Sequence, residues 1–285
     1  MLTRLLTYGS FVRFSHTVFA LPFALTGALL ASQVAELTWR RAGWIVVAMF
    51  TARTAAMAFN RLVDARFDAL NPRTAGREIP RGRVSRIEAA AIVVVASAAF
   101  IASTWPLGML CFALSPLALL IVFWYSLAKR YTTYTQLFLG LALAIAPVGG
   151  WLAAGGQFFA SPPWLLALAT GAWVAGFDVI YACEDLDFDR RQGLRSIPVR
   201  FGVERALHLS RLFHLVTVAA LASLAWLMPL GPIYVLGVTA VALLLAYEQS
   251  LVSASDLSRV KQAFELNGYV GILYLIATAA ALHVR

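Results

Sequence analysis

Apolar residues along the chain come in continuous runs separated by short polar stretches. A helix rises about 1.5 Å per residue, so a run of about 20 residues crosses a hydrocarbon core of about 30 Å. The runs lack the alternation of apolar and polar positions that a membrane β-barrel requires. The pattern therefore predicts an all-α, polytopic membrane protein with nine transmembrane helices, at about residues 14–32, 43–60, 86–104, 107–127, 135–154, 163–183, 206–228, 230–250 and 265–283.

Composition supports this prediction. The chain has 285 residues, of which 61% are hydrophobic and 13% are charged, whereas soluble domains carry about 25% charged residues. No soluble segment, long linker or low-complexity tract interrupts the runs, so we expect one membrane domain over residues 1–285. The two cysteines, Cys111 and Cys183, are isolated in apolar runs and have no metal-binding or disulfide spacing.

The distribution of basic residues predicts the orientation. Of the 23 Lys and Arg, only Arg40, Arg41 and Arg285 fall on one side of the nine spans, and Arg53 lies within a span, which leaves 19 on the other side. Lys and Arg concentrate on the cytoplasmic side of membrane proteins. We therefore expect a cytoplasmic N-terminus, an external C-terminus and a bacterial inner or plasma membrane location. The net charge of +9 thus indicates membrane topology and no nucleic-acid partner.

Acidic residues are scarce, and many of the 14 gather in two clusters at the ends of predicted spans. In the first cluster, Asn60, Asp64 and Asp68 are spaced four apart, so on a continuing helix they line one face. In the second, Asp185 and Asp189 repeat the spacing of four. Like charges at this spacing repel each other in a helix, so the paired acids indicate a compensating cation.

Oxygen ligands of this kind are typical of Mg²⁺, which binds one or two carboxylates together with waters and phosphate oxygens. Arginine, abundant around both clusters, binds phosphate through two parallel hydrogen bonds. The combination predicts a diphosphate held by Mg²⁺ and guanidinium groups at a membrane surface. Two alternatives remain open: solvated loop acids balanced by nearby arginines, and a secondary transporter that uses the acids as cation sites.

Four motifs in order resemble those of the UbiA superfamily of intramembrane prenyltransferases. The family motif N-D-x-x-D-x-x-x-D is matched by residues 60–68, NRLVDARFD, in which Arg61 replaces the first aspartate. The other three motifs are NPRTAGREIPRG at 71–82, YSLAKRYT at 125–132, and Asp185 and Asp189 followed by Gly193 and Ser196. Segments 11–27 and 176–202 are most similar to the branch that prenylates aromatic acids in quinone biosynthesis.

This resemblance implies nine helices around a central cavity, capped on the cytoplasmic side by the two acidic loops. It also implies Mg²⁺-dependent transfer of a polyprenyl chain from polyprenyl diphosphate to an aromatic acid of the 4-hydroxybenzoate or dihydroxynaphthoate type, within membrane lipid, for ubiquinone or menaquinone synthesis. The expected catalytic and metal-binding groups are Asp64, Asp68, Asp185 and Asp189, with Asn60 as a further metal ligand.

The resemblance also directs the choice of substrate-binding residues. Arg73, Arg77, Lys129 and Arg130 are expected to hold the diphosphate, although anchoring to anionic lipid would also explain them. The acceptor carboxylate needs a cation inside the membrane, where ionisable groups indicate function. The expected acceptor-binding residues are Arg13, His16 and Arg53, with Tyr125 and Tyr181 as aromatic faces that could instead be packing residues.

Overall fold

The computed structural model describes residues 2–11 and 19–284, and within them the chain is helical, without a β-strand. The helices are α1 (Leu2–Phe11), α2 (Leu21–Ala31), α3 (Trp39–Leu70), α4 (Arg86–Thr104), α5 (Met109–Ala128), α6 (Thr135–Ala153), α7 (Ser161–Ala182), α8 (Leu186–Arg191), α9 (Ile197–Phe201), α10 (Val203–Leu227), α11 (Gly231–Ser250) and α12 (Val260–His283). Two short 3₁₀ turns, Trp105–Leu107 and Cys183–Asp185, follow α4 and α7. The all-α prediction is confirmed.

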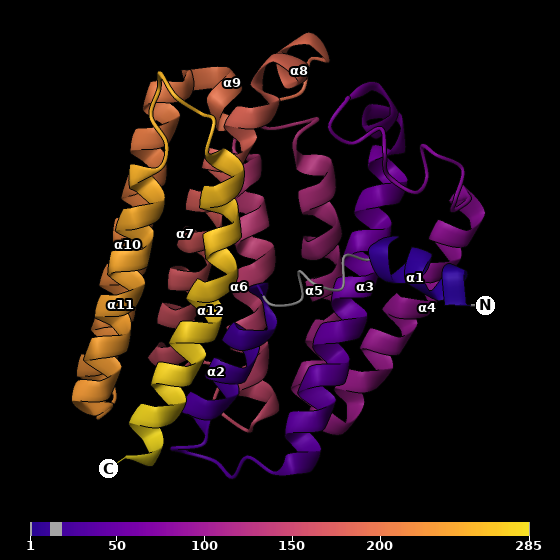
Figure 1. The fold of residues 1–285 in the computed structure, drawn as a ribbon. Coiled ribbons are helices and arrows are strands. Elements are labelled where there is room, and N and C mark those ends of the chain that lie inside the picture. Colours follow the sequence, from indigo (N-terminus) through magenta and orange to yellow (C-terminus); the bar gives the residue numbers. More distant parts are fainter. Residues whose placement is uncertain (1, 12–18, 285) are drawn as a thin grey trace.

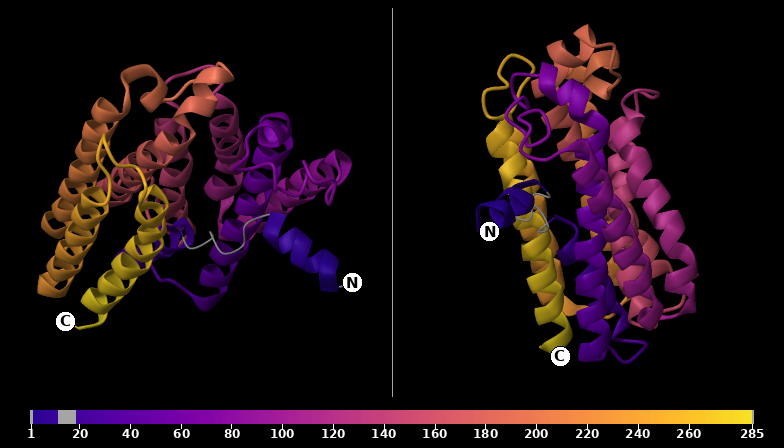
Figure 2. Two further views of the ribbon diagram at one scale, coloured as in Figure 1. Left: turned by 45° about the horizontal axis from the view of Figure 1, so that its top comes forward. Right: turned by 90° about the vertical axis from the view of Figure 1, so that its right-hand side faces the viewer.

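The described residues contain eight helices that are long and apolar enough to cross a membrane. The shorter α2, with 11 residues, occupies the place of the first predicted span, whose residues 14–18 lie outside the described part. The count agrees closely with the nine predicted spans. Helix α1 was not predicted, and it crosses the bundle beside α3 and α4 instead of running along it (Figure 2).

Local sequence fixes where the helices that carry the site begin and end. The Ser85 side chain accepts a hydrogen bond from the Glu88 backbone, and the Glu88 side chain accepts one from Ser85, which starts α4 with a capping box. Helix α3 continues without a break to Leu70, so the acids of the first cluster do share one helix face. Helix α7 stops at Ala182, and Asp185 therefore lies in the 3₁₀ turn, with Asp189 in α8.

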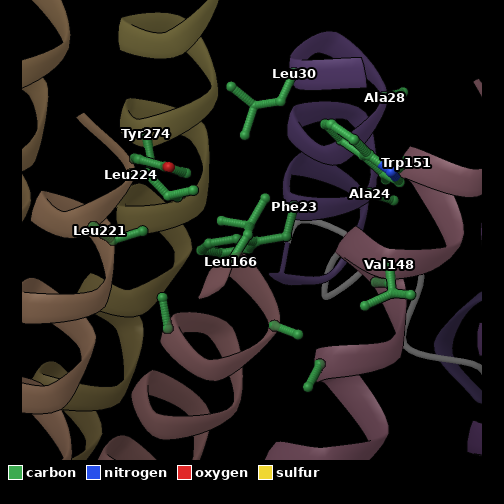
Figure 3. Packing of buried hydrophobic residues seen from close by; sticks show 14 of the residues in the cluster. Phe23, Ala24, Ala28, Leu30, Val148, Trp151, Leu166, Leu221, Leu224 and Tyr274 are labelled. Atoms are coloured by element: carbon green, nitrogen blue, oxygen red, sulfur yellow. The ribbon is translucent and has the colours of Figure 1, made fainter. Parts of the chain in front are cut away.

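The bundle packs closely where small residues meet. A Cβ atom added to Gly27 of α2 would lie 2.1 Å from the carbonyl oxygen of Pro147 in α6, and one added to Gly150 would lie 1.9 Å from that of Ala24. Such contacts let helix backbones approach each other in a membrane protein. Large side chains including Phe23, Trp151 and Tyr274 fill the space around this contact (Figure 3). Helix α7 packs between α6 and α10 and contributes the fully buried Trp173.

Exposed side chains identify the two ends of the bundle. Loop 71–85 and the segment from Cys183 to Ser196 lie at one end, called here the cap end (Figure 1). The exposed tyrosines Tyr131, Tyr134 and Tyr247 lie at or near the cap end. The exposed tryptophans Trp39, Trp164 and Trp226 lie at helix ends away from it, whereas Trp124 lies near it. Between the ends, apolar side chains such as Val94, Leu120 and Leu243 face outward. Aromatic residues concentrate at both interfaces of a bilayer. The protein is an integral membrane protein.

Candidate active site

A polar cavity of about 250 Å³ lies at the cap end, between the ends of α3 and α7. Every residue predicted to bind metal faces it, as do three of the four residues predicted to bind the diphosphate. The first set is Asn60, Asp64, Asp68, Asp185 and Asp189, and the second is Arg73, Arg77 and Lys129. Arg130, the fourth, reaches the same acids from beside the cavity. The two acidic clusters, far apart in sequence, therefore belong to one site.

The first cluster is held by cations from two different segments. Both carboxylate oxygens of Asp68 accept hydrogen bonds from Arg77 Nη1, at 2.7 and 2.8 Å. Asp64 accepts from Lys129 Nζ at 2.9 Å and from Arg130 Nη2 at 3.0 Å. Asp64 and Asp68 are 3% and 5% exposed, and a buried carboxylate requires a partner of this kind. The basic residues thus make it possible for two acids to stand one turn apart.

Asn60 connects this cluster to α5. Its amide nitrogen donates to Asp64 Oδ2 and to Ser126 Oγ, each at 3.3 Å. These bonds leave the amide oxygen of Asn60 available as a ligand on the cavity wall.

The second cluster is bound by loop 71–85. Arg73 makes a two-point ion pair with Asp185, with Nε to Oδ1 at 2.9 Å and Nη2 against Oδ2. Asn71 donates to the same Oδ1 at 3.0 Å, and Arg73 Nη1 donates to the Tyr181 hydroxyl at 2.6 Å. Burial acts to lower the pKa of Arg73, but the hydrogen bond and the attraction of Asp185 outweigh it, so its pKa lies above the usual value.

Asp189 differs from the other predicted acids because no salt bridge or side-chain hydrogen bond engages it among the described residues. It still lines the cavity, beside Phe188 and Arg195. Its carboxylate is therefore open to an incoming cation.

Sequence reasoning missed the residues that join the two acidic segments to α5 and α6. The Arg195 backbone donates to the Lys129 carbonyl at 2.8 Å, and its Nη1 donates to the Tyr131 carbonyl at 2.6 Å. Gln136, 1% exposed, accepts from the Ile197 backbone at 3.2 Å. Asn71 was missed as well, although it lies inside the quoted NPRTAGREIPRG motif. A Gln at the start of an apolar run was the signal that the sequence offered for Gln136.

An apolar cavity of about 220 Å³ lies deeper in the bundle, lined by α2, α3, α5 and α6. Its walls are largely Ala, Leu, Val and Met, and Arg53 of α3 is its charged residue. Tyr125 and Leu139 line both this cavity and the polar one. The Tyr125 hydroxyl is within electrostatic range of both Arg53 and Asp64. The two cavities are therefore neighbours that share a wall.

The structure brings three of the five predicted acceptor-binding residues to these cavities. Arg53 lies in the apolar one, Tyr181 in the polar one and Tyr125 in both. Tyr181 packs against Phe264, with ring centroids 4.5 Å apart, and the Arg73 guanidinium lies 5.0 Å from its ring. Arg13 and His16 lie outside the described residues.

The comparisons with known proteins decide the family. Residues 20–275 match the UbiA prenyltransferase family. The chain belongs to this family. As a UbiA-family prenyltransferase it is an enzyme, and the transporter alternative has no support.

Curated relatives agree over most of this UbiA-family chain. A protein named 4-hydroxybenzoate octaprenyltransferase from Vibrio parahaemolyticus serotype O3:K6 (strain RIMD 2210633) is 30% identical over 273 residues, covering 96% of this chain and 93% of the relative. The protein of the same name from Aeromonas salmonicida (strain A449) is 34% identical over 233 residues, covering 81% and 79%.

Solved structures agree on the fold. A UbiA homolog from Aeropyrum pernix K1, in its apo form, superimposes with a TM-score of 0.85 at 38% identity, over 95% of this chain and 98% of that one. A UbiA homolog from Archaeoglobus fulgidus bound to DMAPP and Mg²⁺ gives a TM-score of 0.74 at 21% identity, over 98% and 100%. At that identity, the second likeness shows the fold alone.

Proposed function

We propose that this UbiA-family enzyme transfers a polyprenyl chain from polyprenyl diphosphate to the ring of an aromatic acid. The observation that carries the proposal is the shared wall of the two cavities. One is rich in carboxylates and cations, the other is apolar with Arg53, and Tyr125 lines both. One substrate would have a charged head and an apolar chain, and the other would have a carboxylate on an aromatic ring. The two would meet where these cavities adjoin. The relatives named 4-hydroxybenzoate octaprenyltransferase support this pair of substrates.

The polar cavity would take the diphosphate. Arg73, Arg77, Lys129 and Arg130 each contact a carboxylate of the site. Guanidinium groups bind phosphate oxygens as readily as carboxylates, in the same two-point geometry. We assign these four side chains to the diphosphate, whose charge grows as the allylic C–O bond breaks. Charges placed in advance around a leaving group lower the barrier.

The donor set fits Mg²⁺. Oxygen ligands line a single cavity from two sides: Asn60, Asp64 and Asp68 on one, and Asp185 and Asp189 on the other. Among the described residues, no three His, Cys, Asp or Glu converge into a complete metal site. Mg²⁺ typically takes one or two carboxylates per ion and completes its shell with phosphate oxygens and water. When bound, the metal would neutralise charge on the leaving diphosphate.

The apolar cavity would take the acceptor. Arg53, which lines this cavity, would pair with the acceptor carboxylate, and Tyr125, which lines both cavities, would present an aromatic face to the reacting carbon. An aromatic face stabilises a neighbouring carbocation, and the apolar lining keeps water from it. Arg13 and His16 remain predictions as acceptor-binding residues.

The decisive experiment incubates the purified protein with a prenyl diphosphate and each candidate acid. We expect C-prenylated product with a 4-hydroxybenzoate-type or dihydroxynaphthoate-type acceptor, dependent on Mg²⁺ and abolished by a chelator. The preferred acid distinguishes ubiquinone synthesis from menaquinone synthesis. Absence of product with every acid, in protein that still binds prenyl diphosphate, would contradict the proposed acceptor class.

We further propose that the cap end faces the cytoplasm of a bacterial cell, with an external C-terminus. The excess of Lys and Arg in the loops supports this orientation. A reporter in loop 71–85 should read as cytoplasmic, and one fused after Arg285 as external. The opposite result would reverse the assigned topology.

A further inference from the structure

Asp178 of α7 is a carboxylate of the polar cavity that forms no salt bridge among the described residues. Asp64, Asp68 and Asp185 each accept a salt bridge, whereas no salt bridge or hydrogen bond engages the Asp178 side chain among the described residues. The side chain is half-buried and borders the cavity. Asp189 also lacks such a partner among the described residues, but it lies in α8, beyond the end of α7, and is assigned above to the metal.

The position of Asp178 places it below the diphosphate end of the cavity. It precedes Tyr181 by about one turn of α7, and it lies about one turn before the end of that helix, after which Asp185 follows in the 3₁₀ turn. Tyr125 and Leu139, the residues that line both cavities, border the same space as Asp178. The Tyr125 hydroxyl is within electrostatic range of Asp178 as well as of Arg53. Asp178 therefore lies on the side of the polar cavity where the acceptor ring would enter.

Aromatic prenylation requires an acceptor for the ring proton close to the reacting carbon. The C–O bond to the diphosphate breaks and its electron pair leaves with the oxygen, while a bond forms between the allylic carbon and a ring carbon. The C–H electron pair of that carbon then returns to the ring, and its proton must be accepted. A carboxylate engaged by Lys or Arg is a weaker base than a free one, which disfavours the three paired acids.

We infer that Asp178 is the catalytic base that accepts the ring proton of the aromatic acceptor and passes it to water in the polar cavity. This inference rests on the proposed function. It assigns to Asp178 a step that begins after the diphosphate has left. Loss of its carboxylate should therefore affect proton removal and leave diphosphate binding intact.

The test compares Asp178→Asn with Asp187→Asn, an exposed acid nearby that does not border the cavity. General-base catalysis contributes about 10²- to 10⁴-fold, so we expect Asp178→Asn to lower kcat by a factor in this range. Prenyl diphosphate binding should remain within about twofold, since the assigned diphosphate ligands are unchanged. Asp178→Glu, which keeps the carboxylate, should recover part of the rate. Asp187→Asn should match the wild type.

An acceptor deuterated at the reacting ring position separates a base from a structural residue. The hydrogen isotope effect on turnover should be larger in Asp178→Asn than in the wild type, because proton removal becomes slower than bond formation. Three results would each overturn the inference: wild-type turnover in Asp178→Asn, an unchanged isotope effect, or a loss of prenyl diphosphate affinity equal to the loss of rate. The last result would indicate that Asp178 is a metal ligand. If the wild type prenylates no acid at all, the proposed function fails first, and the two failures are distinguishable.

Discussion

Two groups of buried polar side chains lie in the same bundle and are built in opposite ways. In the polar cavity, carboxylates from α3 and the α7 end are matched by Lys and Arg from loops. Among α7, α11 and α12 there is instead a chain of hydrogen bonds that includes no Lys or Arg, called here the Glu248 network. Trp173 Nε1 donates to Asn267 Oδ1 at 2.6 Å, and Asn267 Nδ2 donates to Glu248 Oε1 at 2.9 Å.

The difference lies in what surrounds each group. Trp173, Glu248 and Asn267 are at most 1% exposed, and neither cavity described above is lined by them. An ionisable group inside a membrane is by default a candidate for a functional role, yet this network lies among packed helices and borders neither of the two cavities. Burial of an acid is therefore a poor guide to function here. A cavity and a set of opposed charges distinguish the active site.

Asp185→Asn should have the largest effect. The amide keeps the shape but removes the charge that Arg73 pairs with and that Mg²⁺ would require. Loss of one group of a preorganised electrostatic site costs about 10²- to 10³-fold in rate, and we expect at least this loss in prenyl transfer. The control is Glu184→Gln, the exposed neighbouring acid, which should leave the rate unchanged. Near wild-type turnover in Asp185→Asn would remove the second motif from the active site.

Arg53→Met should have the next largest effect, confined to the acceptor. A charge-assisted hydrogen bond contributes about 1.5–3 kcal/mol, which corresponds to a loss of about 10- to 150-fold in acceptor affinity. The apparent affinity for each substrate, measured with the other saturating, checks this. Arg66→Met, at an exposed position of the same helix, is the matched control. Equal losses for both substrates would indicate a distorted cavity, and no loss would place the acceptor carboxylate elsewhere.

Sequence patterns were sufficient for the helices and for many of the residues that line the polar cavity. The long apolar runs predicted membrane helices, and the spacing of Asn60, Asp64 and Asp68 predicted one shared face, because both depend only on local periodicity. The resemblance to a known family then selected the four basic residues. All of them contact the predicted acids in the structure.

Contacts between distant segments could not be predicted in this way. Arg73 meets Asp185 across 112 positions, and Arg130 meets Asp64 across 66. Such pairs depend on how helices pack, which spacing along one helix does not encode. The Glu248 network was also missed, although an acid inside the predicted span 230–250 was a visible signal. The role of Asp178 required the cavity itself, because its lack of a partner is visible only in three dimensions.

Asn267→Ala should lower stability and leave the chemistry intact. Without the amide, Trp173 Nε1 and Glu248 Oε1 both lose their partner, and an unsatisfied buried group costs about 1–3 kcal/mol. Thermal unfolding in detergent should therefore shift to lower temperature, while kcat of the folded fraction stays near wild type. Gln262→Ala, at an exposed site of α12, should have no such effect. A selective loss of kcat without destabilisation would show that the network takes part in turnover.

Glu248→Gln should have the smallest effect, and it tests the comparison most directly because it repeats the acid-to-amide change of Asp185→Asn. The glutamine oxygen can still accept from Asn267, and the shape of the side chain is retained. The second oxygen, Oε2, has no hydrogen-bond partner among the described residues, so its replacement breaks no bond. We expect a change in unfolding free energy within about 0.5 kcal/mol and unchanged turnover with both substrates. A fall in activity comparable to that of Asp185→Asn would mean that the charge of Glu248 is used, and that a carboxylate distant from both cavities serves the reaction through α7.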